Sequence, residues 1–148
     1  MKLISYKQNG KINLGHLEND MIYDLHALDA QIADNMQDFL EGGEYQLQLA
    51  KTALENGSPT ISECDIEIVS PVPNPPSIRD AYAFRQHVAT ARNNRGLDMI
   101  PEFDEIPIFY FTNHHAVFGG GDFPVRQRHT EKLDFELECA AVIGKEGR

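Results

Sequence analysis

Apolar and polar residues alternate in short steps over residues 2–25, with the period expected of half-buried β-strands. Two groups of residues interrupt this alternation, Asn9-Gly10 and Glu18-Asn19-Asp20. Both contain residue types that tolerate the positive φ angles of tight hairpin turns. We therefore predict a small antiparallel meander at the start of the chain.

The spacing of apolar residues then changes to that of helices. Two apolar groups, separated by Gly42-Gly43, recur at helical spacing: Ile32, Met36, Phe39 and Leu40, then Leu47, Ala50 and Leu54. Gly57 follows as a candidate helix end. We expect two short helices or one broken helix, followed by a further strand in which Ile66 and Ile68 alternate with acidic residues.

A proline-rich stretch, Ser70-Pro71-Val72-Pro73-Asn74-Pro75-Pro76-Ser77, follows this region. Prolines lack a backbone N–H and favour an extended path, so the stretch is typical of a linker. The prediction is a small N-terminal α+β domain over residues 1–70 and the beginning of a second domain over residues 71–148.

Several elements are predicted after the linker. Ser77 can cap a helix from about Ile78 to Asn94, which Gly96 would close with a positive φ angle. The remaining predicted elements are a buried strand from Ile106 to Phe111, a flexible turn at Gly119-Gly120-Gly121-Asp122, and a strand from Leu133 to Ile143.

The composition changes this picture mainly by excluding partners. Hydrophobic residues make up 41% of the 148 residues, which is enough for a folded core and argues against disorder. The formal net charge of -10 would repel phosphate backbones and anionic lipid headgroups. We therefore expect neither a nucleic acid nor a membrane as a partner.

The cysteines and the first residues bear on the compartment. Cys64 and Cys139 lie far apart and outside any Cys-x-x-Cys spacing, so neither a disulfide framework nor a zinc ribbon is indicated. The N-terminus turns polar at once, and no apolar run approaches the roughly 20 residues needed to span a bilayer. The expectation is a cytoplasmic protein without an export signal or anchor.

Acidic and apolar residues alternate with period two from Leu133 to Ala140. In a strand, this pattern puts Asp134, Glu136 and Glu138 on one face. One interpretation is a solvated face, because like charges cost little there. The other is a site for a hard cation, because carboxylates without Cys or clustered His ligands suit Mg²⁺, Ca²⁺ or Mn²⁺ better than zinc.

A second constellation combines Asp80 with His87. Seven residues separate them, so in the predicted helix both side chains project from nearly the same side, about 10 Å apart along the axis. Asp80 could then reach a cation while His87 acts as a base that activates water beside a polarised carbonyl. The alternative is a structural or surface histidine.

Two other candidates have less support. Adjacent strand residues face opposite ways, so His114-His115 is interpreted as a loop with solvated imidazoles rather than a metal site. The three glycines at 119–121 lack the following Lys-Ser/Thr and helical pattern of a phosphate loop, so we interpret them as a turn.

Two blocks together resemble the fumarylacetoacetate hydrolase family. They are Ser77-Ile78-Arg79-Asp80-Ala81-Tyr82-Ala83-Phe84-Arg85-Gln86-His87 and Leu133-Asp134-Phe135-Glu136-Leu137-Glu138, continued by Ala141-Val142-Ile143-Gly144-Lys145. The resemblance extends from about Ser70 to the end, whereas the first 65 residues match only in general style. It implies an α+β fold: a small N-terminal α/β domain, then the start of a mixed β-sandwich roll.

The resemblance also implies a chemistry. At matching positions, Asp80, Glu136 and Glu138 would hold Mg²⁺, or alternatively Ca²⁺ or Mn²⁺, and His87 would be the water-activating base. The implied substrate is a 1,3-dioxo or 2-oxo acid that chelates the metal. Carbon–carbon hydrolysis of a substrate like fumarylacetoacetate or an acylpyruvate is the first expectation, and relatives of this family imply a homodimer.

The same comparison with the family's motifs implies two substrate contacts and shows two positions that differ from the family. Tyr82 matches a contact to the substrate's carboxylate, and Arg95 would serve similarly. Phe111-Thr112-Asn113 stands where many members have Lys-Pro, which removes or relocates a cationic contact. Thr90 stands where many small members have Glu, so an acid that orients His87 must come from elsewhere.

Two alternatives remain open beside the hydrolase. The same fold hosts hydratases, isomerases and decarboxylases, and the N-terminal portion could form a catalytically silent binding or assembly module. Family members supply another metal-binding Asp and most of the β-roll after the Glu-x-Glu strand. A last strand without pairing partners would expose apolar surface, so we expect a fragment or a naturally shortened relative.

Overall fold

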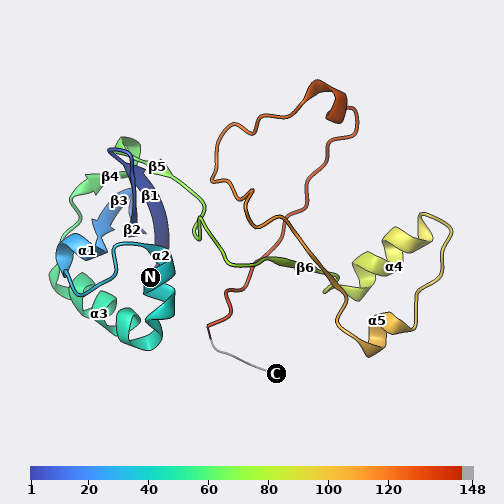
Figure 1. The fold of residues 1–148 in the computed structure, drawn as a ribbon, viewed down its shortest axis with the longest axis horizontal. Helices are drawn as coiled ribbons and strands as arrows, with labels where there is room; N and C mark the ends of the chain where they lie inside the picture. Colours follow the sequence, from blue (N-terminus) through green and yellow to red (C-terminus); the bar gives the residue numbers. More distant parts are fainter. Residues whose placement is uncertain (145–148) are drawn as a thin grey trace. The chain divides into compact units, whose positions relative to one another are not determined.

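A computed structural model describes residues 1–144 of the chain (Figure 1). Its contacts form two units, one of Met1–Pro73 together with the residues from Phe118 onward, and one of Asn74–Val117. The domain boundary predicted after residue 70 stays a prediction. In coarse terms, the α+β class is confirmed, because helices accompany an antiparallel sheet.

The first unit is built on a five-stranded antiparallel sheet with the order β4-β3-β2-β1-β5. Its strands are β1 Leu3–Gln8, β2 Lys11–Glu18, β3 Met21–Asp24, β4 Ile61–Ser62 and β5 Glu67–Ile68. The predicted meander is therefore confirmed as β1 to β3, and the strand predicted at Ile66 and Ile68 is the edge strand β5.

The two tight turns of the meander have the geometry that their residues favour. Asn9 and Gly10 have φ angles of 51° and 81°, and Asn19 and Asp20 have φ angles of 51° and 61°. Two successive positive φ angles are typical of the hairpin turns that match the twist of paired strands. Local sequence thus sets the register of β1, β2 and β3.

Helices cover one side of this sheet (Figure 1). They are α1 Leu25–Leu28, α2 Met36–Glu41 and α3 Gly43–Asn56. Gly43 has a φ angle of +55°, which a glycine adopts without strain and which separates α2 from α3. Two short helices, rather than one broken helix, follow the meander, and α1 was not predicted.

The sheet buries apolar residues on both faces. The cluster on the helical side contains Leu14, Leu25, Ile32, Met36, Phe39 and Ala50. The cluster on the other face contains Ile4, Tyr6, Leu17 and Ile22, with isoleucines of β4, β5 and the residue before β5 packed against it. Burial on both faces explains why this small unit folds around such short strands.

A buried hydrogen bond joins the strands to the first helix. The fully buried Tyr6 side chain donates its hydroxyl to Asp24 Oδ2 at 2.8 Å. Asp24 Oδ1 in turn accepts from the backbone N–H of Ala27 at 3.0 Å, so the same carboxylate caps α1. Burial, and then the bond to Asp24, raise the pKa of the Tyr6 phenol.

The second unit differs from the prediction at its start. Arg79–Ala81 form strand β6, which pairs antiparallel with β7 Phe109–Phe111, and helix α4 covers only Arg85–Asn93. The predicted helix from Ile78 is therefore wrong over its first two turns. Pairing with a distant aromatic strand overrides the local helical pattern. Gly96 closes the helical region with a φ angle of +70°, as predicted.

Other elements of this unit are short. Helix α5 covers Glu102–Glu105. The strand predicted from Ile106 to Phe111 is confirmed over Phe109–Phe111 as β7, but its predicted burial is wrong, because its three aromatic side chains have exposed fractions of 44% to 68%. No helix within residues 1–144 combines the length and the apolar character needed to cross a bilayer.

The strand predicted from Leu133 to Ile143 is also wrong. These residues have no regular secondary structure, and Leu137 is 95% exposed. A period-two pattern defines two faces, but a strand forms only when its backbone finds a pairing partner. No described segment pairs with residues 133–143.

Replacing Tyr6 with Phe should destabilise the first unit by about 1–3 kcal/mol, because Asp24 then loses a buried hydroxyl donor. Urea unfolding followed by circular dichroism measures this loss. The matched control is Tyr45→Phe, since Tyr45 is 63% exposed on α3. Equal unfolding midpoints for the two variants would contradict the structural role of the Tyr6 bond.

The raised pKa of Tyr6 also predicts a loss of stability in alkali. Below the ordinary tyrosine pKa of 10.0, the phenol is protonated in both states and its stabilisation is fully present. Above that pH the unfolded chain releases the proton first, so the free energy of unfolding falls as pH rises. Urea midpoints measured across this range should fall more steeply for the native chain than for Tyr6→Phe, and parallel curves would refute the assignment.

Candidate functional site

The β6–β7 ribbon carries the first candidate residue, Asp80. Asp80 lies directly opposite Tyr110, whose hydroxyl donates to Asp80 Oδ2 at 2.6 Å. The backbone N–H of Tyr82 donates to Ile108 O at 3.1 Å, so the pairing continues beyond β6. Tyr82 follows Ala81, the last residue of β6, and its side chain is 53% exposed.

The opposite face of the ribbon has a different chemistry. The guanidinium of Arg79 lies 4.7 Å from the ring centroid of Phe111 and 5.7 Å from that of Phe109. The two phenylalanine rings meet edge to face, with their centroids 5.7 Å apart. Cation–π contacts of this kind stabilise even exposed pairs. The ribbon therefore separates an Asp–Tyr face from an Arg–Phe face.

His87 lies in the first turn of α4, and its side chain is exposed. An open recess of about 540 Å³ lies beside it, lined by Ala83, Phe84, Arg85, Gln86, His87 and Thr90. Because Asp80 belongs to β6 and not to α4, the prediction that both project from one helix is wrong. The two residues are connected instead by the short segment between β6 and α4.

An ion pair fixes the beginning of α4. Arg85 contacts Asp104 of α5 through two nitrogens, at 3.0 Å and 3.2 Å. The hydrogen bond to Arg85 lowers the pKa of the Asp104 carboxyl, and the same bond raises the pKa of Arg85. The pair links the first turn of α4, which contains His87, to α5.

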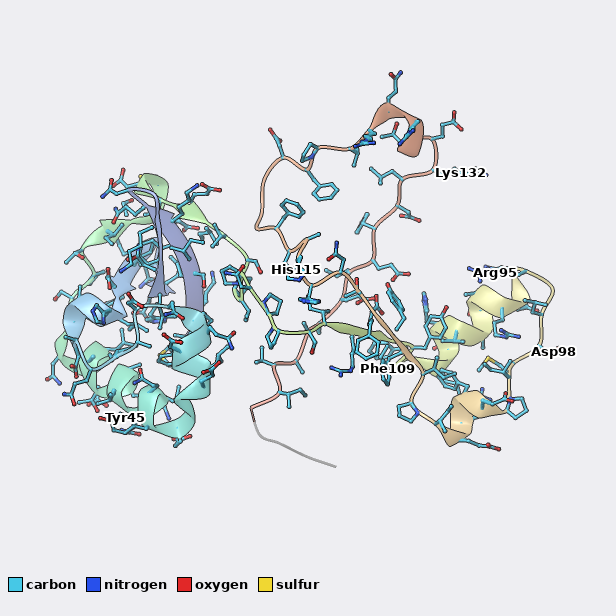
Figure 2. All side chains as sticks on the ribbon, in the orientation of Figure 1. Tyr45, Arg95, Asp98, Phe109, His115 and Lys132 are labelled. Carbon is cyan, nitrogen blue, oxygen red and sulfur yellow. The ribbon has the colours of Figure 1, made fainter. Side chains whose placement is uncertain are left out.

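Thr90 and Arg95 lie further along the chain from His87. The hydroxyl of Thr90 donates to the backbone carbonyl of Gln86 at 2.9 Å, so it is engaged within the helix. Arg95 follows the C-terminal end of α4, at the other end of the helix from His87 (Figure 2). The part of α4 from His87 to its last residue, Asn93, spans roughly 9 Å along the axis at 1.5 Å per residue.

Glu136 and Glu138 lie in the irregular segment that follows residue 132, and both are exposed. Asp80 belongs to the other unit of the chain. No group of three or more His, Cys, Asp or Glu side chains able to hold a metal forms among residues 1–144. The carboxylate donor set of Asp80, Glu136 and Glu138 fits a hard divalent cation by its chemistry, and the ligand roles stay predictions.

The histidine pair lies in a turn, as interpreted from the sequence. The rings of His114 and His115 lie 4.1 Å apart, and the backbone N–H of His115 donates to the side chain of Asn113 at 3.1 Å. Sequence reasoning missed Tyr110, whose contact to Asp80 depends on the pairing of β6 with β7. The only available signal was its place in the Phe-Tyr-Phe strand.

Comparison with known proteins identifies relatives of the whole chain. The family model described as fumarylacetoacetate (FAA) hydrolase C-terminal matches residues 77–148. A mitochondrial oxaloacetate tautomerase of Xenopus laevis is 28% identical over 100% of this chain and 46% of its own length. Mitochondrial oxaloacetate tautomerases of Homo sapiens and Bos taurus are 27% and 25% identical, over 86% of this chain and 38% of their own lengths.

These relatives correct the expected compartment. The chain spans less than half the length of the curated relatives that it matches. Those relatives are named as mitochondrial, so the prediction of a cytoplasmic location is wrong by this comparison. The physical reason is that free cysteines argue against an oxidising compartment but do not distinguish among the compartments that keep thiols reduced.

The motif residues and the relatives agree on the family. The match to the family model begins at Ser77, the first residue of the block that contains Asp80 and His87, and includes Glu136 and Glu138. The relatives extend the similarity over the N-terminal unit as well. Residues 77–148 of the chain therefore belong to the fumarylacetoacetate hydrolase family.

Proposed function

We propose that this chain is part of an enzyme that interconverts the keto and enol forms of a small 2-oxo dicarboxylic acid, with oxaloacetate as the model substrate. One observation carries the proposal: relatives similar to this chain over 86% to 100% of its length are named oxaloacetate tautomerases. Because the chain spans less than half of those relatives, the activity is proposed for the whole protein.

Tautomerisation takes the place of carbon–carbon hydrolysis as the first proposal. Both reactions pass through an enolate next to a carbonyl, so the same site residues serve either one. The names of the relatives favour the isomerase alternative that the sequence left open. Product analysis separates the two reactions, because hydrolysis of an acylpyruvate releases two smaller acids and tautomerisation releases none.

The proposed metal ligands are the carboxylates of Asp80, Glu136 and Glu138, and the proposed ion is Mg²⁺, with Ca²⁺ or Mn²⁺ as alternatives. The support is their donor chemistry, since hard cations prefer carboxylate oxygens. When bound, such an ion polarises the carbonyl of an oxo acid and favours enolate charge. The wider β-sandwich roll and the homodimer belong to the same proposal for the whole protein.

His87 is the proposed acid–base group. A base must reach the C–H proton beside the carbonyl, and the exposed His87 ring beside an open recess is accessible to a small acid. Tyr82, which is 53% exposed directly after β6, is proposed to donate its hydroxyl to a substrate carboxylate. Arg95 stays a weaker prediction, because the length of α4 separates it from His87.

Replacing His87 with Gln should lower kcat for oxaloacetate tautomerisation by about 10²–10⁴-fold, the usual contribution of a general acid or base. The decay of enol absorbance in the ultraviolet measures the rate. His115→Gln is the matched control, because it removes another exposed imidazole of the same unit. An unchanged rate in His87→Gln would reject the proposed base.

Replacing Glu136 with Ala should reduce the stabilisation of the protein by Mg²⁺, because a ligand that binds only the folded state raises the melting temperature. Thermal unfolding with and without Mg²⁺ measures the shift. Glu131→Ala is the control, since Glu131 is an exposed acid just before the same segment. Equal Mg²⁺ shifts in both variants would remove Glu136 from the ligand set, and a stable fold indifferent to Mg²⁺ would favour a silent module.

A further inference from the structure

We propose that Tyr110 is a positioning residue for Asp80: its hydroxyl holds the carboxylate in the orientation from which that carboxylate binds a divalent cation. The inference rests on the proposed function, in which Asp80 is a metal ligand. The carrying observation is the hydrogen bond from Tyr110 Oη to Asp80 Oδ2 at 2.6 Å. Tyr110 lies 30 residues along the chain from its partner.

The strand register makes this contact a property of the fold. Asp80 and Tyr110 are direct cross-strand partners, between the pairs Arg79 with Phe111 and Ala81 with Phe109. Side chains of directly opposed residues lie on the same face with Cβ atoms about 5 Å apart. A slip of one residue would turn the Tyr110 ring to the other face, so the bond exists only in this register.

The opposite face of the ribbon supports the same register independently. There, Arg79 lies over the rings of both Phe109 and Phe111, and these two rings are in edge-to-face contact. For these contacts to form, the side chain of Arg79 must lie on the face of the ribbon opposite to the side chain of Asp80. The Arg–Phe face therefore stabilises the pairing that brings the Tyr110 hydroxyl to Asp80.

The hydrogen bond leaves Asp80 able to bind a cation. An ionised carboxylate has about four acceptor positions on its two oxygens, and Tyr110 occupies one position on Oδ2. Oδ1 remains available on a side chain that is only partly buried. Carboxylates that bind metals are themselves commonly hydrogen-bonded, and such outer partners fix the orientation of the ligand.

The bond from Tyr110 restrains the carboxyl group of Asp80. Hydroxyl-to-carboxylate bonds of 2.5–2.7 Å are the charge-assisted kind, which are stronger than bonds between neutral groups. A donor of this strength restricts rotation of the Asp80 carboxyl, so less rotamer freedom is lost when a cation binds. Tyr110→Phe removes the donor but retains the aromatic ring in β7, which makes it the appropriate variant.

The first measurement needs no metal. In the full 148-residue chain with ¹³C-labelled tyrosine, Tyr110→Phe identifies the Cζ resonance of Tyr110 among the five tyrosines. Asp80→Ala should shift that resonance and leave the resonance of Tyr45, on helix α3, unchanged. A Tyr110 resonance that does not respond to Asp80→Ala, while the other resonances show an intact fold, overturns the contact itself.

The second measurement is the affinity of the same chain for Mg²⁺ by calorimetry. We expect Tyr110→Phe to bind Mg²⁺ about 10–100-fold more weakly than the native chain, the usual effect of losing an outer partner of a ligand. Asp80→Ala should lose the binding, and Tyr45→Phe should match the native chain. Circular dichroism of each variant checks that the fold is retained.

The outcomes separate this inference from the function on which it rests. If Asp80→Ala abolishes Mg²⁺ binding but Tyr110→Phe binds as the native chain does, the positioning role is overturned and the metal role of Asp80 stands. If the native chain binds no Mg²⁺, the metal role fails and the positioning role fails with it. Weaker binding in Tyr110→Phe, together with the shifted resonance, supports both.

Discussion

The pairing of β6 with β7 is the interaction on which the candidate site depends. It joins Arg79–Ala81 to Phe109–Phe111 across an intervening helical segment, and it decides which side chains accompany Asp80. Closing so long a loop costs entropy, which the ladder hydrogen bonds and the Arg79 stacking on two phenylalanine rings offset. This pairing places Asp80 directly opposite Tyr110.

The strands and helices of the N-terminal unit were predictable because residues close together in the sequence determine them. Asn9-Gly10 and Asn19-Asp20 carry the positive φ angles of their turns, and Gly42-Gly43 marks the junction between helices α2 and α3. The spacing of the apolar residues then predicts which face of each strand and helix is buried in the core. Helix α1 was not predictable from the spacing of apolar residues, because four residues are too few to show a helical repeat. Its start is set instead by the side chain of Asp24, which caps the helix.

The sequence predicts residue types for the candidate site, and these roles stay predictions, whereas the geometry around Asp80 depends on the pairing of β6 with β7. The sequence identified Asp80, His87, Glu136 and Glu138 as groups suited to oxo-acid chemistry, because the donor atoms are properties of the residues themselves. It could not identify Tyr110, whose role depends on a strand register set 30 residues away. The sequence also predicted a strand at residues 133–143, which the structure does not form. Alternation of apolar and acidic residues indicates two faces, but it does not show whether the backbone has a strand to pair with.

The surroundings of His87 bear on the choice between the two reactions. A base that must activate water for carbon–carbon hydrolysis gains from a carboxylate that orients its ring, whereas one that takes an acidic proton beside a carbonyl requires less. The residue one helical turn after His87 is Thr90, and its hydroxyl is committed to the Gln86 carbonyl. Among the described residues, no carboxylate lines the recess beside His87. Under the hydrolase alternative, an acid that orients the His87 ring would therefore have to come from outside this recess.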